Sequence, residues 1–250
     1  MKIMLIRHAE PDYSIDSLTP KGRVEAELLA RRISRVTDVL GCYLSPRGRA
    51  LDTAAYTLNK THWPAQVLPW LEEFRGRCFD PDAGRERNCW DFRPHTYEAH
   101  PLWQDPDRFL EDPLFADSNV PRIWKETTDG VDALLASFGY TRKGQVWYCG
   151  KNREGTLLLF CHFAISMAVM GYLTHQSPVT LWQKFCMAPS SVTTLVSEER
   201  LEGEVVFRCI QLGDMSHLYA GGEPYSTAGL FPEFYDGIDN TSPRNYGSMP

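Results

Sequence analysis

LIRHAEP, residues 5–11, joins an apolar run near the start of the chain to an arginine and a histidine. The apolar residues 3–6 are too few for a helix, so they predict a fully buried strand. Arg7 and His8 then lie at the carboxyl end of this strand. Ligands of open α/β sheets usually bind at the edge formed by the carboxyl ends of the strands. Arg7 and His8 are therefore the first candidates for a functional site.

Strands and helices alternate after this first strand. Apolar periodicity and Pro-containing helix starts predict four further elements. These are a helix over residues 20–36, a strand over residues 39–44, a helix that begins at Ser45-Pro46, and a strand over residues 66–71. The alternation predicts a three-layer α/β/α fold with a mostly parallel, doubly wound sheet.

The remainder of the chain divides into an irregular part and a regular part. Residues 77–126 lack sustained periodicity and are rich in proline, tryptophan and acidic residues. We expect this insertion to cap the carboxyl edge of the sheet in a single domain of residues 1–250; a plain surface excursion is the alternative. The regular elements expected after it are a helix over residues 123–140, two strands around a Gly-Lys-Asn turn with the second at 156–161, and a hairpin over residues 191–213. The C-terminal tail over residues 220–250 is rich in Gly, Pro, Asn and Ser, and we expect it to be loosely ordered or to lie along the surface.

The composition excludes several kinds of partner. Apolar residues make up 43% of the chain and charged residues 23%, as in ordinary folded proteins. The net charge of −6, without a basic tail, argues against a nucleic acid partner. The apolar stretch at residues 156–173 is long enough to suggest a membrane span, but His162 interrupts it, which favours a buried strand followed by a buried helix.

The cysteines indicate the compartment. There are seven, an odd number, and no two are placed at the spacing of metal ligands. With no signal peptide ahead of them, they predict reduced thiols in the cytoplasm.

Four predicted strands end in polar residues that a parallel sheet would gather at one edge. They are followed by Arg7-His8, by the segment 45–49 containing Arg49, by Glu72-Glu73, and by His162. Arginine guanidinium groups match phosphate oxygens, and a histidine with one unprotonated nitrogen can attack phosphorus. This chemistry needs no metal and no cofactor. A histidine-carboxylate metal site is the weaker alternative, because no H-x-x-x-H or aspartate-rich motif is present.

Four motifs resemble those of the histidine phosphatase superfamily, which has the phosphoglycerate mutase-like fold. LIRHAEP resembles the R-H-G motif, SPRGRALDTA the S-P-x-x-R-A-x-x-T-A motif, and LEEFRG the L-x-E segment. FCHFAIS occupies the place of the second histidine. The four motifs occur in family order over residues 1–200. The resemblance implies that His8 is the phosphorylated nucleophile and that Arg7, Arg49 and His162 form the phosphate pocket.

The resemblance also assigns the carboxyl groups. Glu73 is implied to be the proton donor that later activates water. Glu72 is the alternative donor, but the L-x-E spacing from Leu71 selects Glu73. Glu10 either lines the pocket or is a solvated carboxylate of a loop. Ser45 and Thr53 are interpreted as structural residues that cap and pack the helix presenting Arg49.

Two residues depart from the family pattern. Ala9 stands where the family has glycine after the nucleophile, and Phe163 stands where glycine commonly follows the second histidine. We expect the small side chain of Ala9 to be tolerated. Phe163 is expected to narrow the pocket or to shift the local backbone.

The leading functional hypothesis is hydrolysis of a small phosphorylated metabolite through a phosphohistidine. A phosphomutase is the first alternative, but the H-G-N sequence of mutases is absent at His162, and their double-arginine motif is only faintly echoed by RERNCW. A non-catalytic phosphate-binding member of the fold is the second alternative. Five aromatic residues of the insertion are expected to form local core rather than to stack on a substrate: Phe79, Trp90, Phe92, Tyr97 and Trp103.

Overall fold

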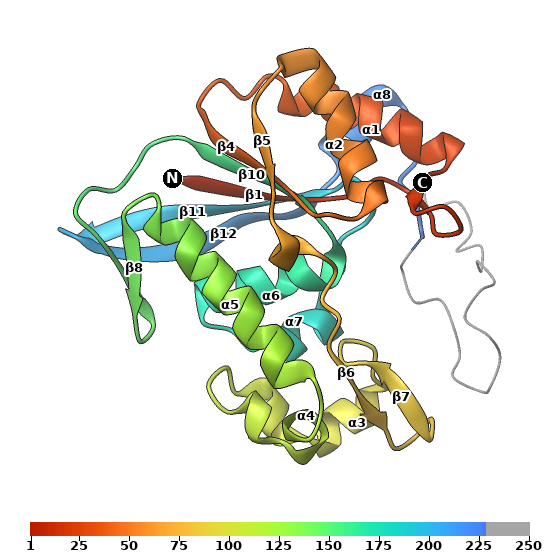
Figure 1. Ribbon diagram of the computed structural model, residues 1–250, viewed down its shortest axis with the longest axis vertical. Coiled ribbons are helices and arrows are strands. Elements are labelled where there is room, and N and C mark those ends of the chain that lie inside the picture. The colour runs from red at the N-terminus through yellow and green to blue at the C-terminus, as the bar shows by residue number, and fades with distance from the viewer. Residues whose placement is uncertain (229–250) are drawn as a thin grey trace.

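The computed structural model describes residues 1–228, in which an eight-stranded mixed sheet lies between two layers of helices (Figure 1). The strand order is β5-β4-β10-β1-β11-β12-β9-β8. The strands are β1 (Lys2–Arg7), β4 (Val39–Leu44), β5 (Ala65–Val67), β8 (Tyr140–Lys143), β9 (Val146–Cys149), β10 (Thr156–Cys161), β11 (Val192–Leu201) and β12 (Glu204–Asp214). This architecture confirms the expected α/β fold class.

Three helices cover each face of the sheet. One face carries α1 (Pro20–Ile33), α2 (Gly48–Thr61) and α8 (Ser216–Gly221); the other carries α5 (Val120–Ala136), α6 (Phe163–Thr174) and α7 (Pro178–Lys184). Alternate residues of the strands point into two separate apolar clusters. For example, Leu158 and Phe160 of β10 pack beneath α1 and α2, whereas Leu157 and Leu159 pack towards α6.

The parallel half of the sheet brings the predicted motifs together. Strands β5, β4, β10 and β1 pair in parallel, while β1, β11, β12, β9 and β8 pair antiparallel. Arg7 pairs with Cys161 in the register between β1 and β10, so His8 and His162 follow neighbouring strands at the same edge. The expectation of a mostly parallel sheet is corrected: within residues 1–228, three strand pairs of this sheet are parallel and four are antiparallel, because β11, β12, β9 and β8 of the later hairpins extend it beside β1.

The start of α2 differs from the expectation. The helix begins at Gly48 rather than at Pro46, and its N-cap Arg47 provides no side-chain cap. The backbone N–H of Ser45 still donates to Phe160 O at 2.9 Å, so the chain remains paired with β10 at that position and turns only afterwards. The expected capping role of Ser45 is therefore wrong.

Two strand assignments are also corrected. The strand expected over residues 66–71 ends at Val67, because Pro69 has no N–H for the ladder and begins a 3-10 turn, Pro69–Leu71. Strands β9 and β10 do not pair around the Gly-Lys-Asn turn. Strand β10 has β4 and β1 on its two sides, so β9 pairs with β12 and with β8, a strand the sequence did not reveal.

Residues 77–126 contain more regular structure than expected. A hairpin of β6 (Arg77–Asp80) and β7 (Arg85–Asn88) precedes α3 (Pro94–Ala99) and α4 (Pro113–Ala116), and α5 begins inside this range. Trp103 is fully buried, with its ring stacked 4.8 Å from that of Phe115. Phe92 and Tyr97 are buried as well, whereas Phe79 is exposed. Most of the aromatic residues expected to form local core do so.

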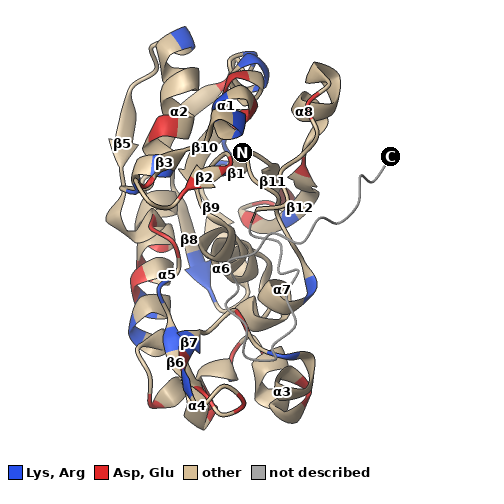
Figure 2. Ribbon diagram, turned by 90° about the vertical axis from the view of Figure 1, so that its right-hand side faces the viewer, with Lys and Arg blue, Asp and Glu red and all other residues tan. Residues whose placement is uncertain are grey.

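The structure bears on two expectations drawn from the sequence, the distribution of charged residues and the structure of the apolar stretch. Figure 2 shows basic and acidic residues interspersed along α1 and α5. Residues 156–173 form β10 and most of α6, and no helix within residues 1–228 is long and apolar enough to cross a membrane. Of the expected C-terminal tail over residues 220–250, residues 220–228 are described and the rest lies outside the described residues.

Candidate active site

His8 follows β1 in a buried position with one nitrogen left free. The side chain is 2% exposed, and Nδ1 lies 2.7 Å from the backbone oxygen of Ala9. Because a carbonyl oxygen only accepts, this contact places the proton on Nδ1 and leaves a lone pair on Nε2. Burial, followed by the charge of Arg7, lowers the pKa of His8 well below its usual value, which keeps the ring neutral.

Arg7 is anchored at one nitrogen. Nη1 donates to the backbone oxygen of Met187, and the side chain is 4% exposed. Nε is buried and has no hydrogen-bond partner among the described residues. The guanidinium carbon lies 5.9 Å from the centre of the Phe163 ring. A buried N–H donor without an acceptor is costly in a folded protein unless something else binds to it.

Arg49, in the first turn of α2, repeats this arrangement. Nη1 donates to Oδ1 of Asp16 at 2.5 Å, while Nε is buried without a partner among residues 1–228. The two arginines thus each use Nη1 as an anchor. Nε and Nη2 form the side edge of a guanidinium group, which can bind two oxygens of one phosphate.

His162 follows β10 and contacts Ser45, the residue that follows the neighbouring strand β4. The residue is fully buried at the N-cap position of α6, and Nε2 lies 2.7 Å from the hydroxyl oxygen of Ser45. Nδ1 is buried without a partner in the described part of the chain. The His162 and His8 rings are 5.1 Å apart. Burial is the main reason that the pKa of His162 is well below its usual value, and the nearby His8 and Arg49 lower it further.

Thr53 joins the two chain segments that carry His8 and Arg49. Its hydroxyl oxygen accepts from the backbone N–H of Ala9 at 3.0 Å and donates to the backbone oxygen of Arg49 at 2.7 Å. These contacts agree with the structural role expected for Thr53. They fix the end of β1 against the first turn of α2.

Glu72 and Glu73 have different surroundings. Both carboxylate oxygens of Glu72 are paired, one with Arg47 and the other with Arg75 at 2.9 Å. Oε1 of Glu73 accepts from the backbone N–H groups of Phe74 at 2.9 Å and Ile165 at 3.1 Å. Oε2 of Glu73 accepts no hydrogen bond from the described residues.

Several observations place Glu73 with the basic side chains. Burial raises the pKa of Glu73 above its usual value, against the opposing effect of its two backbone hydrogen bonds and the charges of Arg7 and Arg49. The backbone N–H of Ile165 that binds Glu73 belongs to the first turn of α6, which His162 precedes. The structure therefore gathers His8, Arg7, Arg49, Glu73 and His162 at one edge of the sheet.

The other predicted pocket residues are occupied by protein contacts. Glu10 accepts hydrogen bonds from the hydroxyl groups of Thr19 at 2.7 Å and Ser226 at 2.5 Å. Ala9 is fully buried in a small apolar cluster with Leu18 and Ala26. The methyl group of Ala9 thus belongs to this cluster.

Phe163 is buried against the site. Its ring makes an edge contact with that of Trp90, with the centres 6.3 Å apart, and it also lies 5.9 Å from the guanidinium carbon of Arg7. The position that commonly holds glycine in the family therefore links Arg7 to the insertion in this chain.

The sequence did not reveal Asp16 or the segment 187–191. Besides Met187, which holds Arg7, Ser190 donates its backbone N–H to the backbone oxygen of His8 at 2.9 Å, and Ser191 accepts from the backbone N–H of Arg7 at 3.1 Å. These are backbone contacts, which carry no side-chain signal. The only feature of the sequence that pointed to Asp16 was its carboxylate, which lies in a loop after Arg7-His8.

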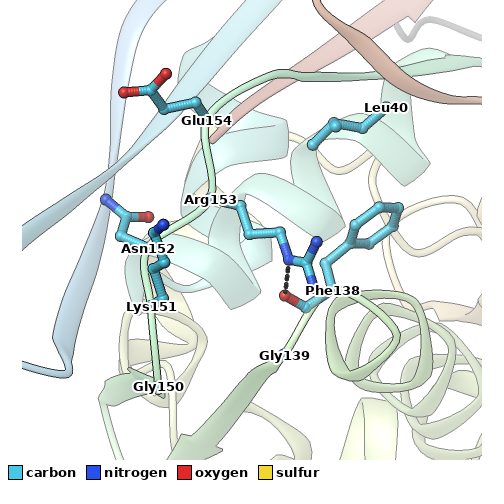
Figure 3. A pocket seen from close by; sticks show the side chains of 8 residues that line it. All are labelled: Leu40, Phe138, Gly139, Gly150, Lys151, Asn152, Arg153 and Glu154. Atoms are coloured by element: carbon cyan, nitrogen blue, oxygen red, sulfur yellow. Dashed lines mark hydrogen bonds between the residues drawn. The ribbon is translucent and has the colours of Figure 1, made fainter.

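The described residues also bear on a metal site and on a second cavity. No group of three or more His, Cys, Asp or Glu side chains within residues 1–228 could hold a metal ion. A surface cavity of about 700 Å³ lies beside the loop that precedes β10, at the opposite end of that strand from His162, and is lined by Phe138, Asn152 and Arg153 among others (Figure 3). There Arg153 donates to the backbone oxygen of Phe138 at 3.0 Å.

Solved structures share this fold. A variant of phosphoserine phosphatase from Entamoeba histolytica, in complex with phosphoserine, is 19% identical with a TM-score of 0.54, over 87% of this chain and 98% of that chain. A mycobacterial glucosyl-3-phosphoglycerate phosphatase, in complex with VO3, is 18% identical with a TM-score of 0.54, over 84% and 98%. A mycobacterial hydrolase is 17% identical with a TM-score of 0.57, over 85% and 98%.

Sequence comparisons add the family. The comparison with curated proteins gave no match. The family model described as histidine phosphatase superfamily (branch 1) matches residues 3–113, the part of the chain that contains His8, Arg49 and Glu73. Two of the solved structures with the same fold are phosphatases. Residues 3–113 of the chain therefore match the histidine phosphatase superfamily, and the described chain shares the fold of these solved structures.

Proposed function

We propose that the protein hydrolyses a small phosphomonoester through a phosphohistidine at Nε2 of His8, without a metal or another cofactor. The observation that carries this proposal is a set of three buried nitrogens without partners in the described chain. They are Nε of Arg7, Nε of Arg49 and Nδ1 of His162. The His162 ring lies 5.1 Å from the His8 ring, and the charges of Arg7 and Arg49 both lower the pKa of His8. A phosphoryl group would supply the acceptor oxygens that these nitrogens lack.

The hydrogen bonds of Ser45 support the role of His162 as a donor. The Ser45 hydroxyl oxygen accepts from the backbone N–H of Arg47 at 3.3 Å, so its single proton is available for Nε2 of His162. A neutral ring that accepts at Nε2 carries its own proton on Nδ1. The lowered pKa of His162 is consistent with this neutral form. Nδ1–H then donates to a phosphate oxygen.

The first chemical step forms the phosphohistidine. The lone pair on Nε2 of His8 attacks phosphorus, and the bond from phosphorus to the leaving oxygen breaks. Arg7 and Arg49 neutralise the charge on the equatorial oxygens. The leaving oxygen takes a proton from the carboxyl group of Glu73, whose raised pKa favours the protonated form.

The second step releases phosphate. Water attacks the phosphorus of the phosphohistidine, and the bond between phosphorus and Nε2 of His8 breaks. The Glu73 carboxylate accepts the proton from that water, which restores both residues for another cycle. Glu72 is unsuited to this exchange because Arg47 and Arg75 occupy both of its carboxylate oxygens.

We propose residues 77–126 as the cap that selects the substrate. The support is the contact of Trp90 with Phe163, which lies against Arg7, and the hydrogen bond from Gln183 to the backbone oxygen of Trp90 at 3.4 Å. The two phosphatases with the same fold are named for phosphoserine and for glucosyl-3-phosphoglycerate, both small phosphomonoesters.

Two arginines of the insertion, Arg77 and Arg87, make local contacts that favour hydrolysis over a mutase reaction. Arg77 contacts Asn88 and Glu86, and Arg87 pairs with Asp80 and Asp91. These side chains stabilise the β6–β7 hairpin by local charge pairs. Such pairing leaves them poorly suited to hold a substrate for return of the phosphoryl group.

We also propose that the protein works in a reducing compartment such as the cytoplasm. All seven cysteines are free thiols, and five of them are buried. Burial raises the pKa of Cys42 and Cys161 to about 12, so these thiols stay protonated and unreactive.

The test is hydrolysis of p-nitrophenyl phosphate with excess chelator. We expect His8→Ala to lower turnover by at least about 10³-fold, because no other residue replaces the nucleophile. His95→Ala, in the exposed part of the insertion, is the matched control and should retain activity. Rapid quenching of the wild-type reaction with labelled substrate should trap an acid-labile, alkali-stable phosphoprotein. Activity that survives in His8→Ala, or that needs an added metal, would contradict the proposal.

A further inference from the structure

Asp16 holds one end of the predicted phosphate ligand Arg49. It lies in the turn between two short strands, β2 (Pro11–Asp12) and β3 (Ser17–Leu18). Oδ1 of Asp16 accepts from Nη1 of Arg49 at 2.5 Å, and Oδ2 accepts from the backbone N–H of Gly48 at 2.9 Å. One carboxylate thus binds both the side chain of Arg49 and the backbone at the start of its helix.

The second contact replaces a missing helix cap. The N-cap residue of α2, Arg47, makes no side-chain cap, and Gly48 is the first residue of the helix. The backbone N–H groups of a first turn have no partner within the helix, and a carboxylate is the favoured acceptor there. Asp16 therefore caps α2 from a separate loop. This contact fixes the turn that carries Arg49.

Gly48 permits the close approach of this loop. A Cβ atom at Gly48 would lie 2.2 Å from the backbone oxygen of Asp16, so only glycine fits. Asp16 itself has φ of +49°, a left-handed conformation that aspartate and asparagine tolerate better than other side chains. Glycine at position 48 and aspartate at position 16 therefore both allow the loop to pack closely against α2.

Tyr13 contacts the same guanidinium group. Its ring centre lies 5.5 Å from the guanidinium carbon of Arg49, although the side chain is 66% exposed. Arg49 therefore has a carboxylate at Nη1 and an aromatic ring from the same loop. The buried Nε remains without a partner among the described residues.

We propose that Asp16 is a positioning residue for phosphate recognition, which it serves by binding Nη1 of Arg49 and the backbone of Gly48. This inference rests on the proposed function. With Nη1 and the helix start fixed, the Nε and Nη2 edge of Arg49 is directed to the phosphoryl group before the substrate arrives. Fixing the donor in advance reduces the conformational entropy lost when phosphate binds.

The direction in which phosphate affinity changes when the Asp16 carboxylate is removed separates a positioning role from a simple effect of charge. A carboxylate beside an anion site repels phosphate, so charge alone predicts that removing it strengthens phosphate binding. Positioning predicts the opposite, because a released Arg49 side chain must be ordered again during binding. The two explanations therefore give opposite results for the same substitution.

Asp16→Asn is the appropriate variant. Asparagine keeps a carbonyl oxygen for the backbone N–H of Gly48 and tolerates a positive φ, but it loses the charge that binds Arg49. Asp12→Asn is the matched control, because it makes the same charge change in the same β2–β3 hairpin, and Asp12 contacts Ser14 rather than Arg49. Thermal unfolding should show that both variants remain folded.

The experiment measures the affinity of each variant for inorganic phosphate by calorimetry. We expect Asp16→Asn to weaken phosphate binding about tenfold or more and Asp12→Asn to leave it unchanged. In a double-mutant cycle with Arg49→Ala, the Asp16→Asn substitution should have no further effect. The KM for p-nitrophenyl phosphate should rise in parallel with the loss of phosphate affinity.

The outcomes are distinguishable. Unchanged or tighter phosphate binding by Asp16→Asn would overturn the positioning role while leaving the proposed function intact. Additive effects of Asp16→Asn and Arg49→Ala would also overturn it, because the two residues would then act separately. A wild-type protein that neither binds phosphate nor hydrolyses phosphomonoesters would instead contradict the proposed function, and the role of Asp16 with it.

Discussion

The hydroxyl oxygen of Ser45 lies 2.7 Å from Nε2 of His162, so the residue after β4 orients the ring of the residue after β10. The two strands are parallel neighbours, which brings their carboxyl ends side by side. The contact engages Nε2, so Nδ1 of His162 is the ring nitrogen left without a partner in the described chain. Ser45, which was expected to cap a helix, therefore forms a hydrogen bond with His162 instead.

Substitution of Ser45 by alanine should reduce activity because the tautomer of His162 is no longer fixed. We expect kcat/KM for p-nitrophenyl phosphate to fall about tenfold or more, in line with the loss of a buried hydrogen bond. Thr57→Val is the control, since the Thr57 hydroxyl oxygen is buried and makes no hydrogen bond to a described residue. Equal kcat/KM for Ser45→Ala and the wild type would remove Ser45 from this role.

Glu73→Gln should slow substrates according to their leaving groups. Alkyl phosphates need a proton on the departing oxygen, whereas p-nitrophenolate departs without one. We therefore expect a loss of about 10²-fold or more in kcat for an alkyl phosphate and a much smaller loss for p-nitrophenyl phosphate. Glu72→Gln breaks ion pairs with Arg47 and Arg75 and should affect both substrates alike. The same loss on both substrates for Glu73→Gln would exclude it as the general acid.

The rate for alkyl phosphates should also depend on pH through Glu73. Its pKa is raised by burial, so the protonated form persists to higher pH than in an ordinary glutamate. The rate should fall as pH rises through this raised pKa, because the general acid is then lost. Glu73→Gln should abolish that limb of the pH profile. A limb that persists unchanged in Glu73→Gln would assign it to another group.

Glu25 of α1 should make the protein less stable as pH rises. Oε2 accepts from the backbone N–H of Glu10 at 2.8 Å, while Oε1 is buried without a partner in the described residues. Burial raises the pKa of Glu25 from 4.5 to about 7. Below pH 4.5 both the folded and the unfolded chain bind this proton, and between pH 4.5 and 7 only the folded chain keeps it. The free energy of unfolding should fall by about 3 kcal/mol over this range.

Chemical denaturation at pH 4.5 and pH 8 tests this dependence. Glu25→Gln cannot ionise and keeps an acceptor for the backbone N–H of Glu10, so it should be the more stable protein at pH 8. Glu27→Gln removes a carboxyl group two residues along the same helix whose pKa is lowered, not raised, by contacts with Lys60 and Arg31, so stability should still fall between pH 4.5 and pH 8. An identical slope for wild type and Glu25→Gln would show that another group is responsible.

Ala9→Gly restores the residue that the family has after the nucleophile. Ala9 is fully buried with Leu18 and Ala26, so the loss of its methyl group should lower the free energy of unfolding by about 1 kcal/mol. The methyl group packs within this cluster, so kcat/KM should stay within about twofold of wild type. A large rise in activity would show that the methyl group restricts the pocket.

Local sequence was sufficient to locate His8 and His162. Each follows an apolar run too short for a helix, and the burial of β1 and β10 follows from that pattern alone. The alternation of strands and helices then placed both histidines at the same edge of a sheet. Arg49 and Glu73 were likewise found from local motifs, because each lies a few residues beyond a strand.

The pairing of strands after residue 140 could not be predicted in this way. Strands β9 and β10 are close in sequence, yet they lie apart because β10 has two other partners. Which two strands pair depends on competition among all the strands that could join the sheet. Local periodicity contains no information about that competition.

The contacts that orient the site residues likewise could not be predicted from the sequence and were seen only in the folded chain. Asp16 reaches Arg49 across 33 positions, and Ser45 reaches His162 across 117. Each contact depends on the directions of two side chains whose backbones are brought together by packing elsewhere. Residue type and position therefore determined which groups could perform the chemistry, whereas the three-dimensional packing determined which of their nitrogens and oxygens are already bound and which remain open to phosphate.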